Sequence, residues 1–201
     1  EISCSLVGSE MCIRDRYGGF NRIDFSKDGF IVTPLIIPNE RKRELNGNLM
    51  LFFTGFSRYA SDIEISRKKA MKDKTKELKE MLALVDDAQN VLVSKGSLNE
   101  FGRMLDHTWK LKRGITNKIS NDSIDAVYKR AVEAGALGGK LLGAGGGGFM
   151  LFYVEKDKQD NVRKELEDLL YVPFEFENGG TRIMYYLSLI HISEPTRLQL
   201  I

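Results

Sequence analysis

The chain has 201 residues, of which 42% are hydrophobic and 29% are charged. This balance is typical of a globular protein that is long enough for one substantial core. The net charge is only +2, and the basic residues are interleaved with acidic ones, so no basic face for nucleic acid is indicated. No apolar run reaches the length of about 18 residues that predicts a membrane span. We therefore expect neither nucleic acid nor membrane as a partner.

The two ends of the chain differ from its body. Both cysteines, Cys4 and Cys12, and one of the two histidines, His191, lie within residues 1–16 and 188–201. The first of these segments lacks the basic region that opens a signal peptide. We expect both ends to be non-native tails. The body then contains no cysteine, which excludes disulfide and cysteine–metal chemistry there and fits a cytoplasmic location.

Hydrophobic periodicity and turn residues predict alternating strands and helices along the body. The predicted strands are Phe20–Phe25, Phe30–Ile37, Leu49–Thr54, Phe149–Val154, Val172–Phe176 and Thr181–Leu187. The predicted helices are Leu78–Leu92, Leu98–Trp109, Asn121–Ala134 and Val162–Leu170, and Ser97 with Glu100 matches a capping box for the second of them. This order implies an α+β sandwich, in which helices pack on one face of a mostly antiparallel sheet.

A glycine run at Gly143–Gly148, with Ala144 as its one other residue, is the most informative motif. Glycine adopts φ > 0 without strain, and successive exposed N–H groups in such a turn form a concave site for phosphate. A purely structural turn is the alternative. The letters satisfy G-x-G-x-x-G, but a Rossmann loop needs a strand before it and a helix after it. Here we predict a helix before the run and a strand after it. A Walker A loop is excluded too, because Phe149 follows where Lys-Ser/Thr is required.

This helix–glycine–strand arrangement resembles the third conserved motif of the GHMP small-molecule kinases. The resemblance runs from about Tyr17 to Tyr186. Four further segments resemble the sugar-phosphate branch of that superfamily, typified by D-glycero-D-manno-heptose 7-phosphate kinase. They are Tyr17-Gly18-Gly19-Phe20-Asn21, Phe52-Phe53-Thr54-Gly55-Phe56-Ser57-Arg58, His107-Thr108-Trp109-Lys110-Leu111-Lys112 and Gly138-Gly139-Lys140-Leu141-Leu142-Gly143.

The resemblance implies a domain organisation. Residues 45–187 would form the GHMP kinase C-terminal domain, a ferredoxin-like sandwich, and residues 17–44 would hold two strands left from the N-terminal domain. ATP and Mg²⁺ would serve the full-length enzyme, whose main ATP loop, metal ligands and catalytic aspartate belong to the N-terminal domain. We therefore assign no catalytic residue and no metal ligand in this chain. Asp15 lies too close to Tyr17, inside the suspected tail, to take the aspartate's role. We expect the isolated chain to be inactive.

The resemblance also implies where ligands bind. Gly143, Ala144, Gly145, Gly146, Gly147 and Gly148 would form the phosphate loop. The candidates for binding a sugar phosphate are Gly19, Arg58, Lys112, Arg113 and Lys140. An arginine suits phosphate because it binds bidentately, but Lys112 and Arg113 also suit an ordinary helix C-terminus. A surface salt bridge is the alternative for Arg58. We expect His107 to be structural.

Two other functions stay open. The chain could belong to another GHMP kinase, of the homoserine or mevalonate type, or it could be a non-catalytic ferredoxin-like binding module. Basic and polar side chains beside the glycine run would favour a phosphorylated sugar, and an apolar pocket would favour an isoprenoid precursor. Early strands that stand apart and expose apolar side chains would argue against a stand-alone module. The sequence does not define an oligomeric state.

Overall fold

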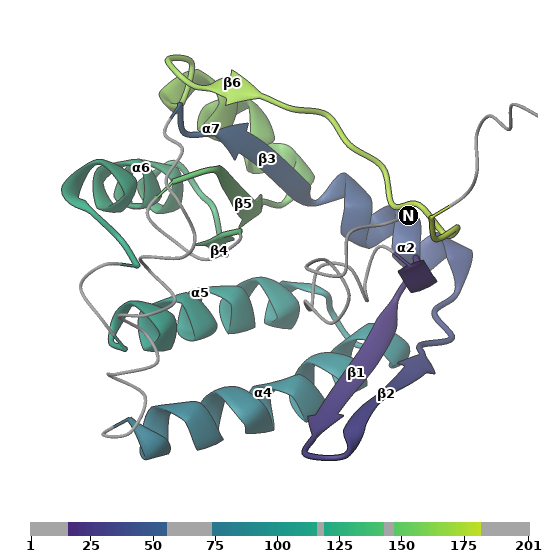
Figure 1. Ribbon diagram of the computed structural model, residues 1–201. Coiled ribbons are helices and arrows are strands. Elements are labelled where there is room, and N and C mark those ends of the chain that lie inside the picture. The colour runs from purple at the N-terminus through teal and green to yellow at the C-terminus, as the bar shows by residue number, and fades with distance from the viewer. Residues whose placement is uncertain (1–15, 56–73, 116–118, 143–146, 182–201) are drawn as a thin grey trace, which may run out of the picture. The chain divides into compact units, whose positions relative to one another are not determined.

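The computed structural model describes residues 16–55, 74–115, 119–142 and 147–181 (Figure 1). Its helices and strands, in chain order, are β1 (Asn21–Ser26), β2 (Gly29–Pro34), α2 (Asn39–Gly47), β3 (Leu49–Phe53), α4 (Thr75–Val93), α5 (Asn99–Arg113), α6 (Asp122–Glu133), β4 (Gly138–Leu141), β5 (Phe149–Tyr153), the short 3₁₀ helix η3 (Lys156–Lys158), α7 (Gln159–Glu165) and β6 (Leu170–Tyr171). The chain divides into two compact units. The larger is Leu35–Phe176, and the smaller joins Glu1–Pro34 to Glu177–Ile201.

The larger unit is built on a four-stranded sheet with the order β4-β5-β3-β6. All neighbouring strands are antiparallel. With α6 between β3 and β4 and α7 between β5 and β6, the elements follow the β-α-β-β-α-β order of ferredoxin-like folds. This confirms the predicted α+β class and the mostly antiparallel sheet.

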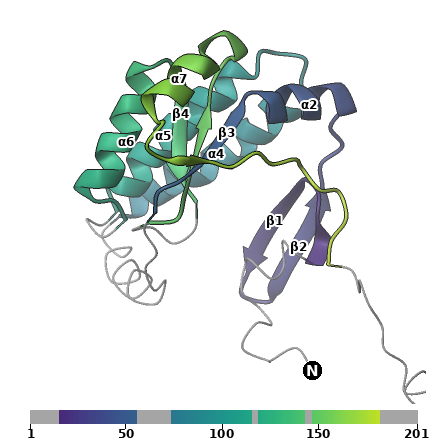
Figure 2. The same ribbon diagram turned by 90° about the horizontal axis from the view of Figure 1, so that it is seen from above.

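One face of this sheet carries the main hydrophobic core. Because directly opposed residues share a face, Met50 and Phe52 of β3 lie with their partners Phe152 and Met150 of β5, and all four are buried. Helices α6 and α7 cover this face, and they lie together beside β3 and β4 in Figure 2. The ring of Tyr128 in α6 lies 6.0 Å from that of Phe152. The predicted packing of helices on one face therefore holds for α6 and α7.

Helix α5 packs against β4 and β5 on the opposite face, with α4 alongside it (Figure 1). Two glycines allow this close approach. A Cβ added to Gly102 of α5 would lie 2.7 Å from Cδ1 of Tyr153 in β5. A Cβ added to Gly138 of β4 would lie 2.7 Å from the backbone N of Asp106, and closer still to the carbonyl oxygen of Gly102. Helix α5 thus adds a layer on the second face of the sheet. The prediction that helices pack on one face did not include this layer.

The short strand β4 corrects the predicted surroundings of the glycine run. We predicted a helix directly before the run, but Gly138–Leu141 intervenes as a strand and pairs with β5. Glycine has low intrinsic preference for a strand, so Gly138 and Gly139 gave no strand signal. They form one because the sheet and α5 leave no space for a side chain at either position. The run therefore connects two antiparallel strands, which still excludes a Rossmann loop.

Helix ends test the local predictions. Of the three residues that the sequence offers as a cap for α6, Ser120, Asn121 and Asp122, the structure uses Asn121, whose side chain accepts a hydrogen bond from the N–H of Ile124 at 2.9 Å. The predicted capping box at α5 is wrong, because no side chain caps its first turn. The Ser97 hydroxyl instead accepts from the N–H of Asn99. The predicted strand Val172–Phe176 is also wrong, because β6 ends at Tyr171, and most of Thr181–Leu187 lies outside the described residues.

The described part of the smaller unit, residues 16–34 and 177–181, contains a hairpin in which β1 and β2 pair antiparallel along their full lengths. This confirms two early strands in a sheet of their own. The hairpin exposes Phe25, Phe30 and Ile31, the last with 69% of its surface accessible. Before β1, Gly19 has φ of +69° and its N–H donates to the carbonyl oxygen of Glu177 at 3.1 Å. A two-stranded sheet with no core of its own is marginal by itself.

Candidate phosphate-binding site

The glycine run lies in the connection between β4 and β5, at the end of the sheet where β3 finishes. The N–H of Leu142, just before the run, donates to the carbonyl oxygen of Phe149 just after it, at 2.8 Å. This bond holds the two ends of the connection together. Gly143, Ala144, Gly145 and Gly146 lie outside the described residues, whereas Gly147 and Gly148 are described.

Thr54, the residue after β3, forms hydrogen bonds with Gly148, the last glycine of the run. Its hydroxyl oxygen accepts a hydrogen bond from the N–H of Gly148 at 3.1 Å and donates one to the Gly148 carbonyl oxygen at 2.9 Å. The N–H of Thr54 donates to the same carbonyl oxygen, also at 2.9 Å. Gly148 has φ of +110°, a conformation that strongly favours glycine. Sequence reasoning gave Thr54 no role, although its place between a buried strand and Gly55 was a usable signal.

A cavity of about 290 Å³ borders Thr54. It extends along the first turns of α6 to the turn before β6, and both polar and apolar side chains line it. The polar ones include Ser123, Arg130 and Asp168, and the apolar ones include Val127 and Leu169. Because its lining is mixed, the cavity favours neither a phosphorylated sugar nor an isoprenoid precursor as its ligand.

The structure distributes the predicted substrate-binding residues over several elements. Lys140 lies on β4, opposite Leu151 of β5, close before the glycine run. Lys112 and Arg113 end α5. Gly19 belongs to the smaller unit, and Arg58 lies outside the described residues. Lys140 and Gly148 are thus brought to one hairpin, whereas Lys112 and Arg113 belong to a separate helix.

Arg113 has a structural partner. Its Nη2 lies 2.6 Å from Oδ2 of Asp125 in α6, and the other oxygen of that carboxylate accepts a hydrogen bond from Ser120 at 2.6 Å. This pairing joins the end of α5 to the start of α6. A guanidinium has five N–H donors, so the pair with Asp125 uses only part of its capacity.

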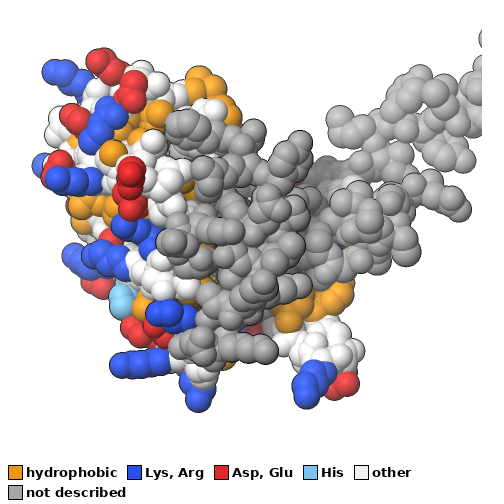
Figure 3. All heavy atoms as spheres, turned by 60° about the vertical axis from the view of Figure 1, so that its left-hand side comes forward, with side chains coloured by type: hydrophobic (Ala, Val, Ile, Leu, Met, Phe, Trp, Pro, Cys, Tyr) orange, Lys and Arg blue, Asp and Glu red, His pale blue; other side chains and the backbone are white. Residues whose placement is uncertain are grey.

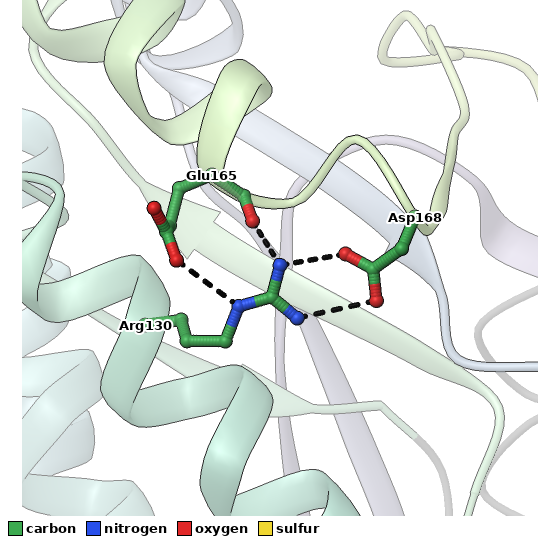
Figure 4. A network of polar contacts seen from close by, with 3 residues as sticks. All are labelled: Arg130, Glu165 and Asp168. Atoms are coloured by element: carbon green, nitrogen blue, oxygen red, sulfur yellow. Dashed lines mark hydrogen bonds and ion pairs between the residues drawn. The ribbon is translucent and has the colours of Figure 1, made fainter.

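Arg130 of α6 is the centre of a second polar network, which joins α6 to α7 and to the turn after it (Figure 4). Its guanidinium pairs with Glu165 through Nε at 3.2 Å and with Asp168 through Nη2 at 2.6 Å. It also donates to the backbone carbonyl oxygen of Glu165. The hydrogen bonds from Arg130 hold the pKa of Asp168 below its ordinary value, and those to Asp168 raise the pKa of Arg130.

We expect Arg130→Met to lower the free energy of unfolding by about 1 kcal/mol at pH 7, because the network is partly exposed and screened by solvent. Folding lowers the pKa of Asp168. The ionised Asp168 carboxylate therefore stabilises the fold fully above its unfolded-state pKa of about 3.9, and this stabilisation is lost as the pH falls through the folded-state pKa. The difference between the variant and the wild type should therefore shrink below about pH 4. Urea denaturation across pH measures it.

Lys129→Met is the matched control, because Lys129 is the neighbouring residue and makes only a long, exposed pair with Glu133 at 3.8 Å. We expect it to change the stability by less than about 0.5 kcal/mol at any pH. If the difference in free energy of unfolding between Arg130→Met and the wild type stays constant down to pH 2, Asp168 is not the partner of Arg130.

A buried hydroxyl joins α5 and α6 on the inner side. Tyr128 donates to Oδ1 of Asp106 at 2.6 Å, and burial together with that carboxylate raises the pKa of the phenol. His107 of α5 lies 2.7 Å from Glu80 of α4, which supports the structural role expected for it. On the face that Figure 3 draws, basic and acidic side chains of the described residues are interspersed.

The described residues do not fit a magnesium site. Among residues 16–55, 74–115, 119–142 and 147–181, no three His, Cys, Asp or Glu side chains gather as metal ligands, so no chemistry of Mg²⁺ is assigned to them. Within the same ranges, every helix is too short or too polar to span a bilayer.

Comparison with known proteins identifies the fold family. The family described as GHMP kinases C terminal matches residues 89–172. D-glycero-alpha-D-manno-heptose 7-phosphate kinase of Campylobacter jejuni is 37% identical over 153 residues, which cover 75% of this chain and 45% of that enzyme. The chain thus spans less than half of this relative.

Two solved structures share the fold. One, a protein of Campylobacter jejuni assigned as a sugar kinase, is 32% identical, with a TM-score of 0.57 over 87% of this chain and 50% of that one. The other, D-glycero-D-manno-heptose 1-phosphate kinase of Bacteroides thetaiotaomicron, is 25% identical, with a TM-score of 0.59 over 86% of this chain and 48% of that one.

The family match and the ferredoxin-like sheet agree on one class of domain, the C-terminal domain of the GHMP kinases. The chain belongs to the GHMP kinases and carries their C-terminal domain.

Proposed function

We propose that this chain is the C-terminal part of an ATP-dependent kinase that phosphorylates a sugar or sugar phosphate, with heptose 7-phosphate as its substrate. The observation that carries the proposal is the glycine run. It follows a strand of a GHMP kinase domain, it is held at both ends by hydrogen bonds, and the matched relative is a heptose 7-phosphate kinase. The proposal places the protein in the cytoplasm.

Phosphoryl transfer requires that the nucleotide phosphates are held, that the acceptor hydroxyl is oriented and that charge is neutralised. We assign the first task to the backbone N–H groups of the run before Gly148, because the Gly148 N–H already donates to Thr54. ATP would bind there, and Mg²⁺ would be held by residues of the N-terminal domain of the full-length enzyme. Lys112, Arg113, Lys140, Arg58 and Gly19 are the proposed substrate-binding residues. No residue of this chain is assigned the catalytic step.

A homoserine or mevalonate kinase is the alternative within the family. The sequence match to a heptose 7-phosphate kinase favours a sugar phosphate. A stand-alone binding module is the alternative outside enzymes. The hairpin β1–β2, which forms a sheet of its own and exposes Phe25, Phe30 and Ile31, argues against it.

The test is ADP release by the natural protein at its full length, supplied with ATP and heptose 7-phosphate, homoserine or mevalonate in turn. We expect turnover with heptose 7-phosphate and at least about 100-fold lower kcat/KM with homoserine or mevalonate. These two compounds carry no phosphate group to pair with the cationic side chains of a sugar-phosphate site. Preference for homoserine or mevalonate would overturn the sugar-phosphate assignment, and release with none of the three would overturn the proposed function.

The 201-residue chain by itself is expected to give no turnover in the same assay. It aligns with 45% of the matched heptose kinase, and the remaining part of that enzyme has no counterpart in it. The control is a thermal melt of the same preparation, which should show a cooperative transition and so exclude an unfolded sample. Turnover by this chain alone would contradict the assignment of catalysis to other residues.

A further inference from the structure

We propose that the exposed face of helix α4 binds the same face of a second copy of this chain, so that two antiparallel α4 helices form the contact of a homodimer. The residues of this surface, the α4 face, are all exposed; they are Thr75, Lys79, Leu82, Ala83, Asp86, Asn90 and Val93. The inference is independent of the proposed function, because the α4 face shares no residue with the candidate phosphate-binding site.

Helix α4 forms an outer layer of the larger unit (Figure 1). It packs against α5, which packs in turn against β4 and β5. Its inner stripe includes Leu78 and Met81, which lie partly buried against the hydrophobic core. Its outer side still exposes apolar side chains, since Leu82 is 66% exposed and Val93 is 44% exposed. An exposed leucine is common on protein surfaces, so the charges around it decide what this face can bind.

The spacing of the α4 face makes it self-complementary. Its residues recur at helical intervals, so they form one stripe along the helix. When two copies pack antiparallel about a twofold axis that passes between Leu82 and Ala83, each residue faces the one equally far beyond the axis in the other copy. The opposed residues are Leu82 with Ala83, Lys79 with Asp86, and Thr75 with Asn90. The small side chain of Ala83 leaves room for Leu82 of the other copy at the centre of the contact.

The charges of α4 favour this antiparallel arrangement. Lys76 and Lys79 lie in its first half and Asp86 and Asp87 in its second half, and all four are exposed. The helix dipole does not account for this order, because it favours acidic residues near the N-terminus. An antiparallel pair brings the basic half of one helix onto the acidic half of the other, whereas a parallel pair would oppose like charges. A second copy of this chain is therefore the partner that the charges fit.

Charge reversal tests the pairing of Lys79 with Asp86. Lys79→Asp and Asp86→Lys should each raise the dissociation constant at least about tenfold, because each variant places two like-charged pairs in its own homodimer. An equimolar mixture of these two variants should associate about as tightly as the wild type, since both pairs in the mixed dimer are again opposite in charge. The matched control is Lys129→Asp on α6 with Asp160→Lys on α7, both at exposed positions. These control variants should associate like the wild type, separately and mixed.

Sedimentation equilibrium of the 201-residue chain measures these dissociation constants. For the wild type we expect a value on the order of 10 μM, because one pair of helices buries less surface than a permanent dimer. Leu82→Glu should raise this value at least about tenfold, whereas Val132→Glu, at an exposed position of α6, should leave it unchanged. A wild-type chain that stays monomeric up to about 1 mM, a constant unchanged in Leu82→Glu, or no association of the mixed charge variants would overturn the proposal.

Two other arrangements give different results. If copies associate through the exposed hairpin β1–β2 instead, Ile31→Glu abolishes association and Leu82→Glu does not. If the remaining part of the natural protein covers the α4 face, the full-length protein is monomeric and Leu82→Glu lowers its melting temperature. Either result would overturn the proposal. We expect instead that the full-length protein forms a dimer, and that Leu82→Glu dissociates it and changes the melting temperature of the monomer by less than about 3 °C.

Discussion

Gly138→Ala is expected to destabilise the larger unit by about 3 kcal/mol or more, a large share of the stability of an ordinary domain. The new Cβ would lie 2.7 Å from the backbone N of Asp106 and 2.8 Å from its Cβ, and closer still to the carbonyl oxygen of Gly102. These are atoms of the α5 backbone or atoms attached to it, so no flexible side chain can move aside. Helix α5 would have to separate from β4. Urea denaturation of the 201-residue chain measures the loss.

Gly47→Ala is the matched control, because it adds the same atom at the end of α2. Its Cβ would meet only the Cε atom of Lys156, at 3.5 Å, which is ordinary contact with a flexible side chain. We expect this variant to be neutral or up to about 1 kcal/mol more stable, since alanine favours a helix over glycine. Equal stability of the two alanine variants would show that α5 does not approach β4 as closely as described.

Gly146→Val is expected to lower kcat/KM of the natural full-length protein at least about 100-fold, if the run binds phosphate through backbone N–H groups. Gly146 lies outside the described residues, and the expectation follows from the composition of the run. A β-branched residue disfavours positive φ and places its side chain where a phosphate would approach the backbone. The measurement is ADP release with ATP and heptose 7-phosphate.

The control for this variant is Gly96→Val, which introduces the same side chain in the turn after α4. There a Cβ would lie 3.5 Å from the Ser94 hydroxyl and meet no other atom within 4 Å. We expect wild-type kinetics from it, and a melting temperature within about 3 °C of wild type for both variants. Unchanged kinetics in Gly146→Val would contradict the phosphate-loop assignment and leave a structural turn.

Some features that depend on residues close in sequence were predicted correctly. Apolar side chains at helical spacing from Ile124 to Ala131 predicted α6. The apolar run at Phe149 predicted β5. The capping box at Ser97 was wrong, although its residue types are right, because α5 begins with Asn99. Residue types permit a cap, and the path of the backbone decides whether it forms.

The family was evident from the sequence, because the glycine run and its flanking segments resemble motifs of the GHMP kinases. The role of the run in binding phosphate stays a prediction. The partner of Gly148 was not evident, since Thr54 is far from it in sequence. Arg113 was assigned to phosphate or to a helix end, and its contact with Asp125 required knowledge of how α5 and α6 meet.

The sequence by itself determined the α+β class, the helices with clear apolar stripes and the resemblance to the GHMP kinases, because periodicity and motifs are local properties of the chain. Only the tertiary structure decided that Gly138 belongs to a strand. The backbone of α5 lies so close to this position that no side chain larger than that of glycine fits there. Only the tertiary structure brought Thr54 to the end of the glycine run. Both results come from pairing β5 with β3 and β4, which no local pattern encodes.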